Sequence, residues 1–126
     1  MTSLYEIFIE TYFPAAHHLR GYDGDCAEPH GHNWVVEVYI QCKKLNNIGI
    51  GVDFRDVKRA VKNILSRLDH TDLNELPEFA AMNPSSENIA AYVYGKLNDE
   101  FQDENIRVSK VRVSEGPNVG VYYWED

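Results

Sequence analysis

The sequence predicts an α+β fold, in which a four-stranded antiparallel sheet with the order β-β-α-α-β-β carries two helices on one face. Three observations lead to this fold class. Two stretches near the N-terminus alternate apolar and polar side chains, which is the period of a strand. Two stretches in the middle repeat apolar residues at steps of three and four, the period of an amphipathic helix. Two short strand-like stretches close the chain.

The first two strands flank a polar loop. Residues 5–13 alternate apolar and acidic side chains, and they lead through residues 14–16 to a pair of histidines. Residues 34–42 form the second strand, with Trp34 and every second residue after it on one face. The loop between them, residues 21–33, is rich in glycine and acidic residues, a composition typical of loops.

The two helices are predicted from their apolar stripes and their capping residues. An apolar stripe runs from Phe54 to Leu68, and Asp53 is a suitable N-cap in front of it. After a linker that contains two prolines, residues 85–88 read Ser-Ser-Glu-Asn, which is another capping signature. The second stripe then continues to Phe101. We therefore expect one helix over 53–68 and another over 85–101.

The closing strands predict an oligomer. They cover residues 109–115 and 119–124 and are joined by a turn at 116–118. The last strand carries apolar side chains on both faces, and Val35 and Tyr39 lie opposite the apolar face of the second strand. A second apolar face and open strand edges usually end in a subunit contact.

Composition and charge exclude several classes of partner. The chain has 126 residues, enough for a single domain with its own core, spanning 1–126. A net charge of −8 argues against a nucleic acid or an anionic membrane, since both require concentrated positive charge. There is no apolar run near eighteen residues and no N-terminal apolar signal segment. We therefore expect a cytoplasmic protein.

The loop at 21–33 holds the residues best suited to chemistry. His30 and His32 are two apart, so in an extended backbone both rings point the same way and can bind one metal ion. A third imidazole follows from His17 or His18, and three histidines are typical of a catalytic zinc site. Cys26 would then act as a thiolate beside the metal. A His-x-His pair is also common by chance, and a cysteine is often a buried filler.

Several motifs in their order along the chain resemble those of the pyruvoyl-tetrahydropterin synthase family. They are Phe13-Pro14-Ala15-Ala16-His17-His18-Leu19, Cys26 followed by His30-Gly31-His32-Asn33, Leu68-Asp69-His70, Pro84-Ser85-Ser86-Glu87-Asn88, and Ser114-Glu115-Gly116. Three residues separate Cys26 from the His-Gly-His triplet. That spacing is most similar to the carboxy-tetrahydropterin synthase branch, which serves queuosine and other deazapurine pathways.

The resemblance implies a tunnelling fold, in which the sheets of a trimer form a barrel and two trimers stack as a hexamer. It also implies that zinc is held by His17, His30 and His32, with His18 a non-ligand. The implied substrate is dihydroneopterin triphosphate. Zinc at an open position would chelate the two hydroxyls of its side chain as a Lewis acid. The implied products are a carboxy-tetrahydropterin, acetaldehyde and triphosphate.

The resemblance gives the remaining residues their roles. Cys26 would be the base, His70 would relay a proton, and Asp69 would orient His70. Glu115 would accept two hydrogen bonds from the guanidine-like edge of the pterin. Ser85 and Ser86 would cap a helix, contact the pterin, or do both. Without the resemblance, Asp69 and His70 would be a polar helix end and Glu115 a turn residue.

Three questions stay open in the sequence. The pyruvoyl-type synthase, which eliminates triphosphate but keeps the carbon side chain, is the nearer alternative. A zinc-binding module without catalysis is the more distant one, although metal binding alone would require neither Cys26 nor Glu115. The residues that hold the triphosphate are also open, and four basic residues are candidates: Arg20, Lys43, Lys44 and Arg112.

Overall fold

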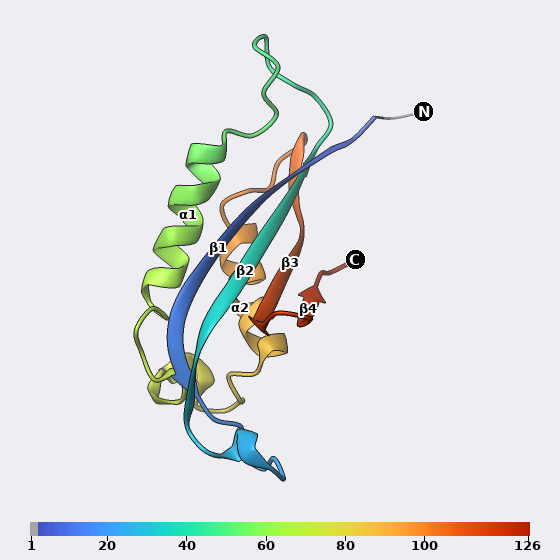
Figure 1. Ribbon diagram of the computed structural model, residues 1–126. Helices are drawn as coiled ribbons and strands as arrows, with labels where there is room; N and C mark the ends of the chain where they lie inside the picture. The colour runs from blue at the N-terminus through green and yellow to red at the C-terminus, as the bar shows by residue number, and fades with distance from the viewer. Residues whose placement is uncertain (1–2) are drawn as a thin grey trace.

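The computed structural model describes residues 3–126 and confirms the predicted element order (Figure 1). Three short 3-10 helices lie in the connections: η1 (Asp25–Ala27), η2 (Leu73–Glu75) and η3 (Pro77–Phe79). The main elements are β1 (Tyr5–His17), β2 (His30–Cys42), α1 (Phe54–Ser66), α2 (Ser86–Asn98), β3 (Ile106–Gly116) and β4 (Val119–Tyr123).

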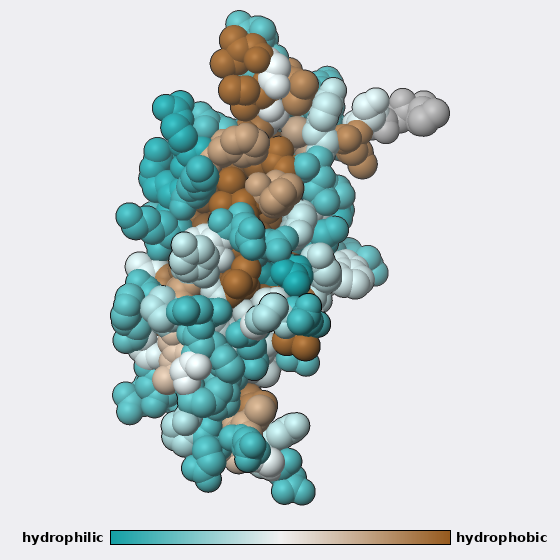
Figure 2. All heavy atoms as spheres, viewed as in Figure 1, coloured by the Kyte–Doolittle hydropathy of each residue, from teal (hydrophilic) through white to brown (hydrophobic). Residues whose placement is uncertain are grey.

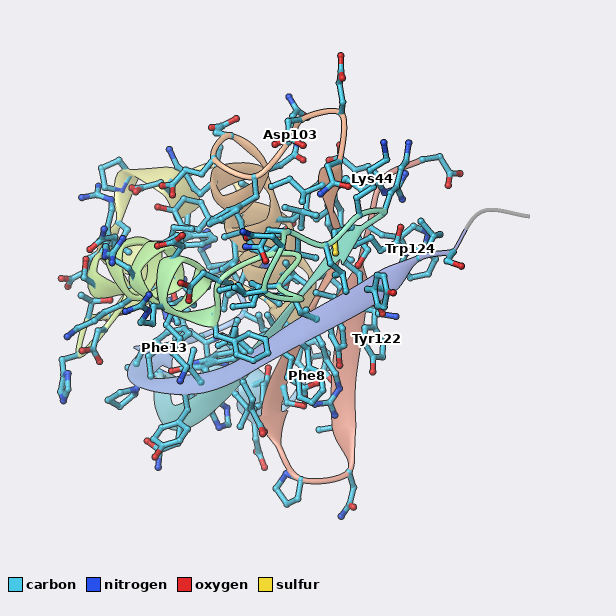
Figure 3. All side chains as sticks on the ribbon, turned by 90° about the horizontal axis from the view of Figure 1, so that it is seen from above. Phe8, Phe13, Lys44, Asp103, Tyr122 and Trp124 are labelled. Carbon is cyan, nitrogen blue, oxygen red and sulfur yellow. The ribbon has the colours of Figure 1, made fainter. Side chains whose placement is uncertain are left out.

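The four strands form one antiparallel sheet in the order β1-β2-β3-β4, and both helices pack on one face of it (Figure 1). The buried residues of α1 and α2 join the inward residues of the strands in a single apolar core. Figure 3 shows Phe13 on the helix side of β1 and Phe8 on the opposite side. The predicted fold class is therefore correct.

Strands β1 and β2 are longer than the sequence predicted. The first continues through Pro14 to His17, and the second begins at His30, so that His17 pairs with His30 and Ala15 with His32. Pro14 is tolerated because β1 is an edge strand. Its carbonyl accepts from the backbone N–H of His70 at 2.7 Å, which shows that the proline nitrogen also faces away from β2 and no ladder bond is lost.

Both helices begin where their capping residues predict and end earlier than their apolar stripes. The Asp53 carboxylate accepts from the Arg55 N–H at 2.8 Å, and the Ser85 hydroxyl accepts from the Asn88 N–H at 3.1 Å. Leu68 lies beyond the end of α1 but remains fully buried in the core. The apolar stripe therefore predicts correctly that Leu68 is buried, but the helix itself ends before that residue.

The face of the sheet away from the helices combines aromatic rings with ion pairs. Phe8, Tyr39 and Tyr122 form a row of ring contacts, with centroids 5.9 and 6.1 Å apart. Across the strands, Arg112 pairs with Glu37 at 2.9 Å. This face is therefore partly polar as well as apolar.

Exposed apolar side chains gather at one end of the molecule (Figure 2). The loop between β2 and α1 contributes Leu45, Ile48 and Ile50, and Ile48 is 73% exposed. Among residues 3–126, no helix is both long enough and apolar enough to cross a membrane.

Candidate active site

Three imidazoles meet where β1 ends and β2 begins, at the lower end of the sheet in Figure 1. His17 faces His30 across the ladder, and His32 follows two residues later on the same face of β2. The ring centroids are 4.5 Å apart for His17 and His30, 4.7 Å for His30 and His32, and 5.3 Å for His17 and His32. The two strands thus bring together the three histidines that the family resemblance implied as ligands.

Backbone carbonyls orient two of the rings. Nδ1 of His17 lies 2.7 Å from the Pro84 carbonyl oxygen, and Nδ1 of His30 lies 2.7 Å from the Glu28 carbonyl oxygen. A carbonyl can only accept, so each Nδ1 carries the proton and each Nε2 presents a lone pair. This arrangement is characteristic of metal-ligating histidines, whose second nitrogen donates to a carbonyl or carboxylate.

Burial favours the neutral form of His17 and of His32. Burial lowers the pKa of His17, although the hydrogen bond to Pro84 and the charge of Glu115 oppose that shift. Burial also lowers the pKa of His32, again against the charge of Glu115. Neutral imidazole is the form that binds metal.

The donor set fits a metal ion. Nε2 of His17 and Nε2 of His32 are buried without a hydrogen-bond partner, an arrangement that is costly unless a cation satisfies them. The donor atoms of His17, His30, His32 and Glu115 all lie within 4.8 Å of one another. Three imidazoles and one carboxylate are ligands that zinc accepts.

Glu115 belongs to this cluster. The family resemblance implied only a contact between Glu115 and the pterin, and gave no sign that Glu115 lies beside the histidines. Its Oε2 lies 3.3 Å from Nε2 of His32, and its Oε1 lies 3.8 Å from Nε2 of His17. The Ser86 hydroxyl, in the first turn of α2, donates to Oε1 of Glu115 at 3.2 Å. The Ser85 hydroxyl instead caps the helix. Ser86 therefore contacts Glu115 in the site, whereas the hydroxyl of Ser85 bonds to the backbone at the start of α2.

Trp34 is a component of the site that the sequence places only on one face of the second strand. It is fully buried, and its indole lies edge-on to His17 and to His32, at centroid distances of 4.7 and 5.3 Å. Its Nε1–H donates to the Ala15 carbonyl at 3.3 Å. Its position two residues after His32, on the same face of the strand, was the available signal.

Asp69 and His70 form a pair on the outer edge of β1. Nδ1 of His70 lies 2.8 Å from Oδ1 of Asp69, and the His70 side chain is 77% exposed. An open hollow of about 600 Å³ is lined by His70 and by His32, one of the candidate metal ligands, but not by Asp69. His70 makes no direct contact with the histidine cluster within the described chain.

The two cysteines have the contrasting positions that the sequence predicted. Cys26 is half-buried in η1, and its carbonyl accepts from the Leu19 N–H at 2.7 Å, which holds this loop beside the end of β1. Cys42 is buried at the far end of β2. Among residues 3–126, no hydrogen bond joins the Cys26 thiol to an imidazole.

The four basic candidates for the triphosphate are directed elsewhere. The Arg20 guanidinium donates to the carbonyls of Phe79 and Met82. Arg112 pairs with Glu37 on the face away from the helices. Lys43 and Lys44 follow the end of β2 that is opposite His30.

Fold and donor set together define the class of protein: an α+β sheet of the tunnelling type with a candidate metal centre at one end. The sequence model of the 6-pyruvoyl tetrahydropterin synthase family matches residues 6–126. The chain belongs to this family and is a lyase.

Named relatives and a solved structure agree with this assignment. A protein of Archaeoglobus fulgidus, provisionally named 6-carboxy-5,6,7,8-tetrahydropterin synthase, is 40% identical over 109 residues, covering 86% of each chain. The 6-carboxy-5,6,7,8-tetrahydropterin synthase of Synechocystis sp. is 33% identical over 98 residues, covering 74% of each chain. The structure of Caenorhabditis elegans 6-pyruvoyl tetrahydropterin synthase has a TM-score of 0.86 at 23% identity, covering 99% of this chain and 98% of that one. The last comparison establishes the shared fold.

Proposed function

We propose that this protein is a zinc-dependent lyase that converts 7,8-dihydroneopterin triphosphate to 6-carboxy-5,6,7,8-tetrahydropterin, with release of acetaldehyde and triphosphate. Its place would be in queuosine and deazapurine biosynthesis. The observation that carries the proposal is the cluster of three imidazoles, two with their Nδ1–H fixed by carbonyls, beside Glu115. The names of the two relatives support the product.

The residues divide into a metal-holding group and a proton-moving group. His17, His30 and His32 would hold zinc, which when bound supplies a Lewis acid for the substrate hydroxyls. Cys26 would take a proton as thiolate, a role open to a half-buried loop cysteine and closed to the buried Cys42.

The acid–base pair and the recognition group complete the site. His70 would relay a proton and Asp69, at 2.8 Å, would orient it. Glu115 would accept from the pterin edge, with Ser86 fixing one of its oxygens. Ser85 would act mainly by setting the start of α2.

We also propose that the chain works as a homo-oligomer, a trimer or a hexamer. Within residues 3–126, no strand pairs with the outer edge of β4, and the backbone contacts on the outer side of β1 are confined to its end, at Pro14 and Ala16. The exposed loop apolar residues and the exposed His70 are consistent with surfaces that another copy covers. Sedimentation equilibrium would test this, and a single-chain mass would contradict it.

The decisive experiment incubates the zinc-loaded protein with 7,8-dihydroneopterin triphosphate and identifies the products by mass. Formation of the carboxy product with acetaldehyde supports the proposal. A product that keeps the carbon side chain would instead identify a pyruvoyl-type synthase. Unchanged substrate, with a zinc-loaded and folded protein, would indicate a non-catalytic zinc module. Lys62→Gln is a suitable control, because Lys62 is exposed on α1 and should not alter the products.

A further inference from the structure

Glu115 stands in the position of a fourth metal donor. Zinc ligands lie about 2.0–2.2 Å from the ion in a tetrahedron, so two donors on one ion are separated by roughly 3.3–3.6 Å. Oε2 of Glu115 lies 3.3 Å from Nε2 of His32, which matches that separation. Its other oxygen lies 3.8 Å from Nε2 of His17.

The protonation pattern of His17 favours a cation between these atoms. Nδ1 of His17 donates to the Pro84 carbonyl, so Nε2 of the neutral ring presents a lone pair towards Glu115. A lone pair that faces a carboxylate oxygen is repulsive unless a cation lies between them. Neither Nε2 of His17 nor Nε2 of His32 has a hydrogen-bond partner among the described residues.

Local structure aims the Glu115 carboxylate at the histidines. The pairing of β3 with β4 shifts register between Val113 and Gly116, and such irregularities re-aim side chains out of the regular ladder. The Ser86 hydroxyl then holds Oε1 at 3.2 Å. With Oε2 beside His32 and Oε1 held by Ser86, the carboxylate is oriented towards the histidines and would have to turn to present both oxygens to a pterin edge.

We propose that Glu115 is a metal donor of the resting enzyme, and that the arriving pterin draws it away and so opens a coordination position. The displacement step rests on the proposed function for the identity of the ligand, whereas the donor role rests on the distances alone. Metal and pterin are then coupled through one carboxylate. By linkage, pterin binding must weaken metal binding by the same factor as the metal weakens pterin binding.

The donor role is tested with Co²⁺ alone, by titrating metal-free proteins and recording the visible spectrum. Loss of a residue that only hydrogen-bonds to a metal ligand weakens metal binding by at least roughly tenfold. Glu115→Gln would lose a direct donor, so its Co²⁺ affinity should fall by at least that factor and its spectrum should change. Glu115→Asp keeps the charge but withdraws the oxygens, and it should lose affinity as Glu115→Gln does. Glu87→Gln, a charge change on the exposed neighbour of Ser86, should match the wild type. Wild-type affinity and spectrum in either Glu115 variant would overturn the donor role.

The displacement is tested by adding pterin itself, 2-amino-4-oxopteridine, which has neither the side chain nor the phosphates that could bind the metal or react. The wild-type Co²⁺ spectrum should move towards that of Glu115→Gln, and its Co²⁺ affinity should fall. The Glu115→Gln spectrum should not change. A wild-type spectrum that stays fixed when calorimetry shows pterin bound, or a pterin that does not bind at all, overturns the displacement. The product assay reports separately on the proposed function, so the two failures are distinguishable.

Discussion

At the scale of single residues, the candidate metal centre contains two imidazoles, His17 and His30, whose protonation is set by backbone carbonyls. His32 differs from His17 and His30 in that, among the described residues, no carbonyl orients its ring, and its Nε2 lies 3.3 Å from Oε2 of Glu115. His18 is adjacent in sequence, but its backbone is held by the Asn74 side chain and it is outside the donor cluster. These positions make the two residues a matched pair for mutation.

We expect His32→Ala to lose most of its metal, while His18→Ala keeps it. Loss of one of three imidazoles removes a direct donor and should cost more than the roughly 10- to 100-fold in affinity that follows loss of an outer-sphere partner. Elemental analysis of the purified variants measures this directly. Full metal content in His32→Ala would remove His32 from the ligand set.

We expect Cys26→Ala to lose turnover while it keeps its metal and its fold, because the thiolate is proposed as base and not as ligand. Cys42→Ala should remain active, since Cys42 is buried at the far end of β2. The product assay, run with circular dichroism and elemental analysis, measures all three properties. Equal turnover of the two variants would contradict the role of Cys26.

At the scale of elements, the site exists because β1 and β2 extend beyond the residues that alternate apolar and polar side chains. Helix stripes and capping residues were visible in the sequence, and so was the His-x-His spacing. The extension of β1 was not, because Pro14, Ala15 and Ala16 carry no alternation and a proline argues against a strand unless the strand is known to be an edge.

Contacts through space were the other part that the sequence could not supply. Glu115 and Ser86 come from different elements, and nothing in either stretch indicates that they touch. The contact of Trp34 with His17 depends on the pairing of β1 with β2, so the sequence places Trp34 only on one face of its strand. The side chains of Asp69 and His70 are in contact, as the family resemblance implied, but no sequence signal indicated how far they lie from the candidate metal ligands.

The loop after β2 offers a test of element packing. A Cβ added at Gly51 would overlap the Cys42 sulfur, so Gly51→Ala should destabilise the fold by about 1–3 kcal/mol through overpacking. Adding Cys42→Ala removes that sulfur and should recover part of the loss. Urea unfolding of the single and double variants gives the coupling energy. If the losses of stability in the two single variants simply add in the double variant, Gly51 and Cys42 are not in contact.

At the scale of the whole molecule, the buried histidines link stability to pH. The pKa of His17 and of His32 is lowered in the folded, metal-free protein. As pH falls through the ordinary histidine range near 6.5, the unfolded chain takes up protons that the folded chain resists, so unfolding becomes easier. The contribution of His17 and His32 to the free energy of unfolding is therefore fully present above about pH 6.5 and is lost as the pH falls below it.

We expect urea midpoints of the metal-free protein to fall between pH 7 and pH 5, and the decrease to be smaller in His32→Ala, which lacks one of the two groups. Denaturation at a series of pH values in the presence of a chelator measures this. A midpoint that stays constant over the range, or that rises, would contradict the lowered pKa values.

The burial of Trp34 against the histidines gives the chain an optical reporter of its own metal. The sequence has two tryptophans, and the other, Trp124, is 59% exposed (Figure 3). Their emissions should therefore separate, with iodide in solution quenching Trp124 and a paramagnetic ion among the imidazoles quenching Trp34 at close range. Co²⁺ should dim the blue, iodide-resistant component alone. Occupancy could then be followed by fluorescence during binding, with no label attached to the protein.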